Sequence, residues 1–427
     1  MDFVKEALLQ NGHWEAGQFS IKRIGGRLIE REAFPALQRS ARKKYITVLR
    51  GLRRTGKSVL AQQLLIRFLG EAGEPKEIAW FEFDRAMNAT PEDLDSLLNY
   101  FQGQGAKIIF LDEVPFVPKW QDVLKRHYDR TDVKFVATGS SAIEFDKRTA
   151  ESLAGRFEII NVTPFSLNER LLAKGKKAYA GSGHERARRA GELQAECNEY
   201  LLAGGLPEIT LEADENERSK YVRESLLGPL FYKDFPAAFP SANPDLLFKS
   251  LELLSGTAGS TYQLQPLAQV LGVSHPTVAT QVALLEKTLL LRTIYNHTPS
   301  IIKQRRTSKK IVFADTGVLH ALRPDVPIGA LAENAAANAL DAKFFWRTPE
   351  GHEVDLLLPG KKVAIEVKYQ AHLTSADERN LQFFLEHRKG WKGVMITKMD
   401  SEKGDIPRIP LWKVLLGSHE AIAALLT

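Results

Sequence analysis

The chain has 427 residues, of which 44% are hydrophobic and 26% charged, and its net charge is +6. The length predicts two to four domains, and the composition is typical of a globular protein. Cys197 is the only cysteine, which excludes an intramolecular disulfide and a zinc site built from cysteines. We find no apolar run of about 18 residues that could span a membrane and no secretion-signal pattern at the N-terminus. The sequence therefore predicts a cytoplasmic protein, and its positive charge favours polyanionic partners.

The first part of the chain predicts an α/β core. Residues 1–44 are expected to form a basic, helical segment. Five short runs rich in β-branched and aromatic residues follow, separated by helical stretches. Such strands, when they are almost continuously apolar, indicate a parallel sheet covered on both faces. The expected strands are 45–50, 77–84, 107–112, 134–139 and 158–163.

A phosphate-binding loop follows the first expected strand. Residues 51–58 (GLRRTGKS) match the pattern G-x-x-x-x-G-K-[ST], and a helical run follows them. Backbone N–H groups and the helix N-terminus of such a loop hold nucleotide phosphates, while Lys57 reaches the phosphates and Ser58 binds Mg²⁺. The alternative, a chance glycine–lysine turn, is disfavoured by the flanking strand and helix. The residues expected to bind ATP here are Gly51, Arg54, Thr55, Gly56, Lys57, Ser58 and Val59.

Two acidic residues, Asp112 and Glu113, stand at the end of the third expected strand. Asp112 is expected to hold Mg²⁺ as a metal ligand and to contribute to nucleotide binding. Glu113 is expected to orient and polarise the attacking water. The alternative, two solvated acids at a strand end, is disfavoured because the strand and the phosphate loop occur together in the expected order.

The pair GLRRTGKS and FLDE resembles the AAA+ ATPases. The resemblance implies ATP hydrolysis, with Lys57 and Glu113 as catalytic residues, by a homo-oligomeric ring for which a hexamer is one arrangement. It also implies a polar sensor residue at the end of the next strand, which Thr138 or Ser140 matches. An arginine that reaches the nucleotide of a neighbouring subunit is matched by Arg156, whose alternative is an ordinary helix-terminal arginine. The region 166–235 has no obvious second-sensor arginine.

More narrowly, the stretches SLAGR…PFSLNER and YLLAGGLPEI resemble signatures of a prokaryotic AAA+ subgroup. Its members carry a C-terminal domain of unknown function that resembles PD-(D/E)xK nucleases. The resemblance covers most of the chain and implies its fold and use of ATP. The expected domains are an AAA+ core with a parallel sheet (1–165), a helical lid (166–235), a winged helix (240–325) and a restriction-endonuclease-like α/β domain (326–427).

Residues 265–285 predict two short helices around a tight turn. Gly272 suits the turn, Ser274 can cap the second helix, and Pro276 fits its first turn. The runs 289–296 and 310–314 can pair as a wing, which gives a winged helix that we expect to bind DNA; protein binding is the alternative. The residues expected to contact DNA are His275, Thr277, Thr280, Gln281, Lys303, Arg305, Arg306, Lys309 and Lys310.

Residues 353–368 predict a β-hairpin with a four-residue loop, which sets Asp355 opposite Glu366, while Lys368 shares a face with Glu366. Two carboxylates and a lysine at one point can bind Mg²⁺ and activate water against a phosphodiester. The spacing resembles the D…(D/E)-x-K site of restriction-endonuclease-like domains, in which Glu333 matches an additional acid. The alternative is an ion-paired surface, although unpaired charge in otherwise apolar strands would be costly.

The sequence thus predicts a Mg²⁺-dependent ATPase that acts on DNA or binds it, and it leaves nuclease activity of the C-terminal region open. The alternative is an ATP-dependent switch or sensor. In that case the winged helix binds a protein partner, and the C-terminal domain is inactive.

Overall fold

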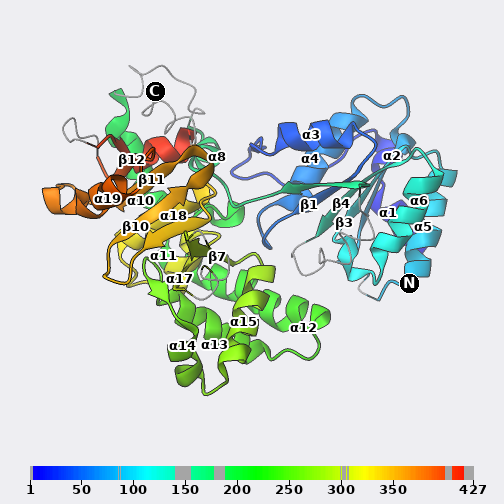
Figure 1. Ribbon diagram of the computed structural model, residues 1–427. Coiled ribbons are helices and arrows are strands. Elements are labelled where there is room, and N and C mark those ends of the chain that lie inside the picture. The colour runs from blue at the N-terminus through cyan, green and yellow to red at the C-terminus, as the bar shows by residue number, and fades with distance from the viewer. Residues whose placement is uncertain are drawn as a thin grey trace. The chain divides into compact units, whose positions relative to one another are not determined.

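The computed structural model describes most of the chain as two compact units. The first comprises Met1–Thr163 and the second Pro164–Thr427 (Figure 1). Within the described part of the chain, no helix is both long enough and apolar enough to cross a bilayer. The described residues are 3–84, 86, 88–139, 155–176, 188–298, 300, 304, 307–399 and 406–417.

The first unit is built on a sheet of five parallel strands in the order β2-β3-β4-β1-β5. Almost every residue of the first four strands is buried, as expected of strands covered on both faces. The predicted parallel sheet is confirmed, and each strand begins and ends within two residues of its prediction. The strands are β1 (Ile46–Arg50), β2 (Ile78–Glu82), β3 (Ile108–Asp112), β4 (Lys134–Gly139) and β5 (Phe157–Asn161).

Helices cover both faces of this sheet. They are α1 (Phe3–Gln10), α2 (His13–Ala16), α3 (Phe34–Ala41), α4 (Lys57–Leu69), α5 (Pro91–Gly103) and α6 (Trp120–Arg130), with short turns η1 (Pro75–Glu77) and η2 (Val114–Phe116). Val48 packs with α1, α2, α5 and α6, whereas Leu49 packs with α3 and α4, since successive strand residues face opposite sides. The expected helical lead-in is wrong for residues 17–33, which are irregular and in which Gly25 and Gly26 adopt positive φ angles.

The second unit is built on one continuous sheet of eight strands. They are β6 (Thr261–Tyr262), β7 (Leu291–Asn296), β8 (Lys309–Phe313), β9 (Phe344–Arg347), β10 (Glu353–Leu358), β11 (Val363–Lys368), β12 (Lys392–Thr397) and β13 (Arg408–Pro410). Their order is β13-β12-β11-β10-β9-β7-β8-β6. Because β7 pairs in parallel with β9, the regions 240–325 and 326–427 share this sheet. The antiparallel pairs β7–β8 and β10–β11 form where the sequence predicts a wing and a hairpin.

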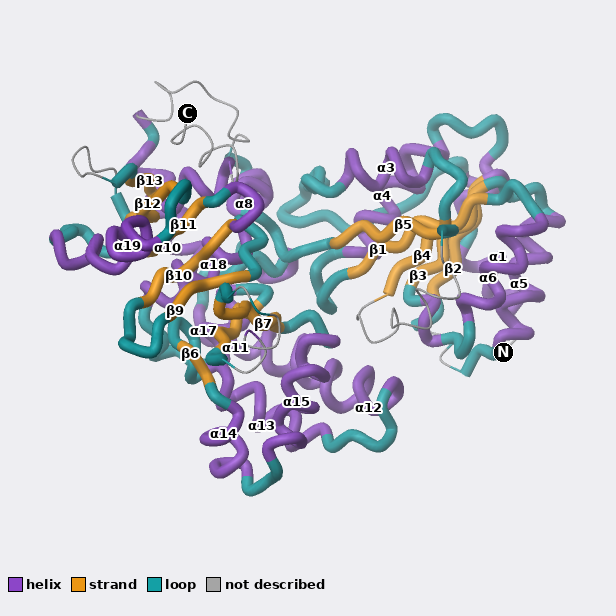
Figure 2. The backbone as a smooth tube through the Cα atoms, viewed as in Figure 1, coloured by secondary structure: helices purple, strands orange, loops and turns teal. Residues whose placement is uncertain are grey.

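Many helices surround the second sheet, and α13, α14 and α15 gather beyond its β6 edge (Figure 2). An apolar cluster that includes Leu381 and Phe384 packs α19 against the strands. The α-helices are α8 (Leu167–Ala173), α10 (Ala190–Ala203), α11 (Glu215–Tyr221), α12 (Phe235–Ala238), α13 (Pro244–Ser255), α14 (Leu264–Leu271), α15 (His275–Lys287), α17 (Thr316–Leu322), α18 (Ile328–Ala339) and α19 (Ser375–His387). Two π-helices, η4 (Val222–Leu227) and η5 (Leu230–Asp234), and two short 3-10 helices, η3 (Pro207–Ile209) and η6 (Pro359–Lys361), complete the described part of the unit.

A tight junction at Gly204 and Gly205 fastens α10 to α17. A Cβ atom at Gly205 would lie 2.2 Å from the Phe165 carbonyl oxygen, so a side chain does not fit. The Gly205 N–H donates to Oδ2 of Asp315 at 2.7 Å. Asp315 also caps α17, because its Oδ1 accepts from the Val318 N–H at 3.0 Å. The glycines of the AGGLPE stretch therefore permit a close approach to the Asp315 side chain, which caps α17, and to the backbone of Phe165.

Candidate functional site

The phosphate loop connects β1 to α4, and its backbone depends on two glycines. Gly56 has a φ of 87°, in the left-handed region that favours glycine. A Cβ atom at Gly51 would lie 2.1 Å from the Val162 carbonyl oxygen, so this position also excludes a side chain. Thr55 Oγ1 donates to the Leu52 carbonyl oxygen at 2.8 Å and folds the loop back on itself. The N-terminus of α4 thus stands directly behind the loop.

Lys57, in the first turn of α4, is only 4% exposed. Its Nζ donates to the carbonyl oxygen of Leu52 at 3.1 Å, which holds the ammonium over the loop. The positive end of a helix and the backbone N–H groups around it attract anions. The loop therefore combines an ammonium and a helix N-terminus in an arrangement suited to phosphate.

The acidic pair lies beside this loop. Asp112 is 3% exposed, and the Thr138 hydroxyl donates to its Oδ1 at 2.6 Å. The N–H of Glu113 donates to the same hydroxyl at 2.9 Å, so Thr138 links both acids. Burial and the charge of Glu113 raise the pKa of Asp112 to about 7, although hydrogen bonds from Thr138 and Ser58 oppose the rise.

The hydrogen bond between Ser58 and Asp112 joins the loop to the end of β3. A hydroxyl and a carboxylate are the hard oxygen ligands that Mg²⁺ prefers. A cation between them would offset the burial cost that raises the Asp112 pKa, so the donor set fits Mg²⁺. Glu113 has a φ of 52°, an uncommon conformation for a non-glycine residue, which turns the chain at the strand end. Ser140, the other sensor candidate, lies outside the described residues.

Arg156 lies at the opposite end of the strands from the phosphate loop, where β1 begins. Its carbonyl oxygen accepts from the N–H of Ile46, the first residue of β1, at 2.8 Å. The phosphate loop follows the other end of this five-residue strand, about 16 Å away at the rise of a β-strand. Arg156 Nε donates to Oδ1 of Asp129 at 2.9 Å. Its side chain therefore cannot reach the phosphate loop of its own chain.

The second unit contains the predicted pair of helices. Gly272 ends α14 with a φ of 66°, and the Ser274 side chain caps α15 by accepting from the Thr277 N–H at 3.3 Å. His275 and Thr280 are exposed and Thr277 is half-buried. The expectation for Gln281 is wrong: its side chain is 6% exposed, because this side of α15 packs inward. Lys303, Arg305 and Arg306 lie outside the described residues.

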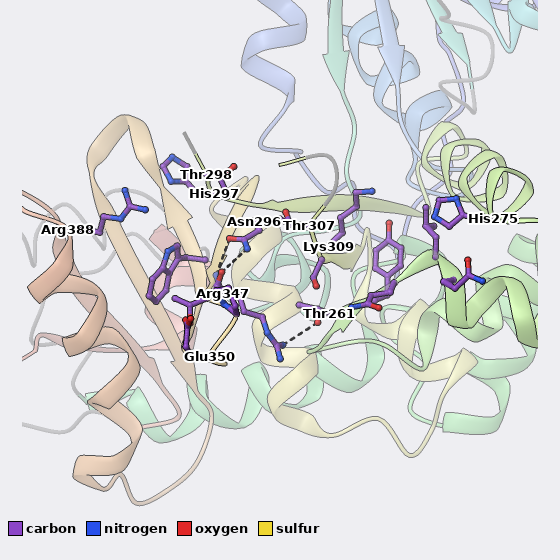
Figure 3. A pocket seen from close by; sticks show the side chains of 18 residues that line it. Thr261, His275, Asn296, His297, Thr298, Thr307, Lys309, Arg347, Glu350 and Arg388 are labelled. Carbon is purple, nitrogen blue, oxygen red and sulfur yellow. Dashed lines mark hydrogen bonds between the residues drawn. The ribbon is translucent and has the colours of Figure 1, made fainter. Parts of the chain in front are cut away.

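A pocket of about 1030 Å³ opens between these helices and the sheet (Figure 3). Lys309, which was predicted to contact DNA, lines it together with His275. Tyr262 of β6 also lines it, and further titratable side chains come from the ends of β7 and β9 and from the end of α19. These are His297, Arg347, Glu350 and Arg388.

Lys310, the next residue of β8, points elsewhere and is 2% exposed. Its Nζ lies 2.7 Å from Glu333 Oε1, 2.6 Å from Glu353 Oε1 and 3.4 Å from Asp355 Oδ1. Burial opposes the charge of Lys310, but these three carboxylates outweigh it and raise its pKa. The expectation that Lys310 contacts DNA is therefore wrong, because its ammonium neutralises buried acids.

The hairpin has the predicted register from Leu358, which pairs with Val363, to Leu356, which pairs with Ile365, the pair next to Asp355 and Glu366. Glu366 Oε1 accepts from Lys368 Nζ at 2.7 Å, and Asp355 Oδ2 accepts from the N–H of Val367 at 2.8 Å. The Oε2 atom of Glu366 is buried without a hydrogen-bond partner. Burial, together with the charge of Asp355, raises the pKa of Glu366, although the ammonium groups of Lys368 and Lys310 oppose the rise.

These contacts do not fit the predicted metal site. No group of three or more His, Cys, Asp or Glu side chains within the described ranges could hold a metal ion. The proposed ligands Glu333, Asp355 and Glu366 are instead tied to Lys310 and Lys368. We therefore correct the assignment of metal ligands: Lys310 pairs with Glu333 and Asp355 and supplies the positive charge that a cation would bring, whereas the pairing of Lys368 with Glu366 agrees with the prediction.

Family models match three parts of the chain. An AAA domain model matches residues 43–171. This part of the chain is thus similar to AAA domains. Residues 194–329 match a domain of unknown function, DUF8612, and residues 328–414 match another, DUF4143.

Several relatives cover most of the chain. The uncharacterized protein MJ1637 of Methanocaldococcus jannaschii is 28% identical over 88% of this chain and 85% of its own length. The uncharacterized protein Rv2008c of Mycobacterium tuberculosis is 25% identical over 81% of this chain and 75% of its own. A solved structure, the Walker-type ATPase PABY2304 of Pyrococcus abyssi, covers 72% of this chain and 99% of its own, with 18% identity and a TM-score of 0.46.

One residue that contacts the phosphate loop, Arg31, was not predicted from the sequence. Arg31 is buried, and its guanidinium donates to the Thr55 carbonyl oxygen at 2.7 Å and to that of Thr163 at 2.6 Å. Gln63 of α4 donates to the carbonyl oxygen of Ile29 at 2.8 Å. The irregular segment before β1 thus braces the loop. Arg31 stands 24 residues before Thr55 in a stretch without periodicity, so no sequence pattern marks it.

Proposed function

We propose that this protein is a Mg²⁺-dependent ATPase whose second unit binds DNA. The observation that carries the proposal is the convergence of Lys57, Ser58, Asp112 and Thr138 at one edge of the parallel sheet. The AAA domain over the same residues supports it. Lys57 and the N-terminus of α4 bind the phosphates, and Gly51, Arg54, Thr55, Gly56 and Val59 belong to the same loop and helix start.

In the proposed reaction, Ser58 and Asp112 hold Mg²⁺, which when bound offsets charge on the phosphates. Glu113 orients the attacking water and takes up its proton. Thr138 keeps the two acids in place, because its hydroxyl bonds to both. Arg156 acts on the nucleotide of a neighbouring subunit in a homo-oligomer, since the sheet separates it from its own loop.

For the second unit we propose a winged helix that binds duplex DNA. Two helices joined by a tight turn, with a strand pair behind them, have the form of such modules. His275, Thr277 and Thr280 on α15 would meet a groove, and Lys309 a phosphate. We leave DNA cleavage out of the proposal, because Lys310 already neutralises Glu333 and Asp355, two of the carboxylates that would have to bind the metal ion.

Binding of a fluorescent ATP analogue tests the nucleotide site. Lys57→Ala should weaken binding at least about tenfold, because it removes a charge-assisted contact worth more than about 1.4 kcal/mol. Lys76→Ala, at an exposed position, is the matched control and should bind as the wild type does. Equal affinities of all three proteins would overturn the assignment of the loop.

A further inference from the structure

The pocket in the second unit has the chemistry of a polyanion site. Figure 3 shows His275, the first residue of α15, at one end of the pocket and Arg388 at the other. Lys309 and Arg347 lie between them. Among the described residues that line the pocket, Glu350 is the only one with a carboxylate. Arg347 is partly neutralised, since it pairs with Glu353 at 2.9 Å. Lys309 and Arg388 therefore carry most of the positive potential.

The same pocket also offers neutral groups that could meet a nucleobase. Burial, reinforced by the positive charge of Arg388, lowers the pKa of His297, so that its imidazole is uncharged at neutral pH. The backbone around it is fixed, because Asn296 bonds to both the N–H and the carbonyl oxygen of Arg347, at 3.1 and 2.9 Å. Cations beside a neutral ring suit a ligand that alternates phosphates with flat, polar bases.

Size separates a single strand from a duplex. A volume of about 1030 Å³ corresponds to a cube about 10 Å on a side, at the upper end of ligand-sized pockets. The major groove of DNA alone is about 12 Å wide, so a duplex is too broad to enter. A short single-stranded segment is not.

We propose that this pocket binds a single-stranded DNA segment that continues from a duplex held on α15. The proposal rests on the proposed duplex binding and adds that the second unit prefers junctions between single and double strands. His275 connects the two surfaces, because it begins the helix that would face the duplex and also lines the pocket. A strand leaving the duplex there would pass Lys309 on its way to Arg388.

The test is fluorescence anisotropy on the full-length protein with three probes: a blunt duplex, the same duplex with a short dT overhang, and oligo-dT alone. We expect the overhang to bind about tenfold more tightly than the blunt duplex. Arg388→Gln should remove most of that preference and reduce the salt dependence by about one phosphate contact. Lys389→Gln removes an exposed charge next to the pocket and should change neither quantity.

The possible outcomes separate this inference from the proposed function. Blunt and overhang probes that bind equally, with no effect of Arg388→Gln, would overturn the pocket assignment and leave duplex binding standing. If oligo-dT binds in a manner that depends on Arg388 and the blunt duplex does not bind, the pocket assignment is supported and the winged-helix proposal is refuted. If poly-glutamate competes with the overhang probe as well as oligo-dT does, the pocket assignment is also overturned, because the site would then recognise negative charge without bases. Failure to bind any DNA would refute both.

Discussion

At the scale of single residues, Asp112 predicts how the ATPase depends on pH. Its pKa is raised to about 7, first by burial and then by Glu113. The ionised carboxylate is the form that holds Mg²⁺, so affinity for Mg²⁺ is present above this pKa and is lost as the pH falls through it. We expect the Mg²⁺ concentration for half-maximal hydrolysis to rise about tenfold per pH unit below the pKa.

Thr138→Val sharpens this prediction. The substitution removes a hydrogen bond that lowers the pKa of Asp112, so the acidic limb of the pH profile should move to higher pH. The measurement is hydrolysis against pH at limiting Mg²⁺. Thr131→Val is the control, because the Thr131 hydroxyl donates to the carbonyl oxygen of His127 at the end of α6, away from Asp112. An acidic limb that stays in place in Thr138→Val would exclude this role for the hydroxyl.

Lys310 predicts a large difference between neighbouring residues. Lys310→Met leaves Glu333, Glu353 and Asp355 without their shared counter-ion, and removal of one partner of a buried ion pair costs about 3–5 kcal/mol. Lys309→Met, on the same strand but half exposed, should cost less than about 0.5 kcal/mol. Denaturant unfolding followed by a signal from the second unit measures both. Equal stabilities would show that Lys310 does not neutralise the cluster.

At the scale of elements, the close packing around the end of α10 predicts opposite effects of two glycine substitutions. Gly205→Ala places a methyl group 2.2 Å from the carbonyl oxygen of Phe165, just before α8, so the two backbones must move apart and the free energy of unfolding should fall by about 1–3 kcal/mol. Gly191→Ala, inside α10 with open space around it, should raise stability by up to about 1 kcal/mol. Thermal unfolding compares the two, and a tolerated Gly205→Ala would contradict the packing described here.

Elements with a local pattern were predictable from the sequence, and contacts between distant segments were not. The strands around the phosphate loop, the turn at Gly272 and the hairpin register all follow from short-range spacing. The pairing of β7 with β9 joins residues about 50 apart and leaves no such trace. Lys310 was misassigned for the same reason. A run of basic residues predicts an exposed segment, and only the folded chain brings Glu333 next to the Lys310 ammonium.

At the scale of the whole molecule, Arg156 predicts that activity requires assembly. Arg156→Ala should bind ATP but lose hydrolysis, because its partner nucleotide belongs to a neighbour. Mixing it with Glu113→Gln, which keeps the arginine, should restore part of the activity. Asp129→Ala breaks only the ion pair of Arg156 and should remain active. If the mixture hydrolyses no ATP and Asp129→Ala is also inactive, Arg156 has a structural role instead.

The most direct test of the account is steady-state ATP hydrolysis with Mg²⁺, with and without DNA, using Lys57→Ala as the blank. The predicted result is hydrolysis that is faster than the blank and rises on addition of DNA, because DNA binding by the second unit would then be coupled to hydrolysis at the phosphate loop. Hydrolysis that ignores DNA would contradict the coupling and favour a switch that acts on a protein partner. Hydrolysis no faster than in Lys57→Ala would contradict the ATPase itself.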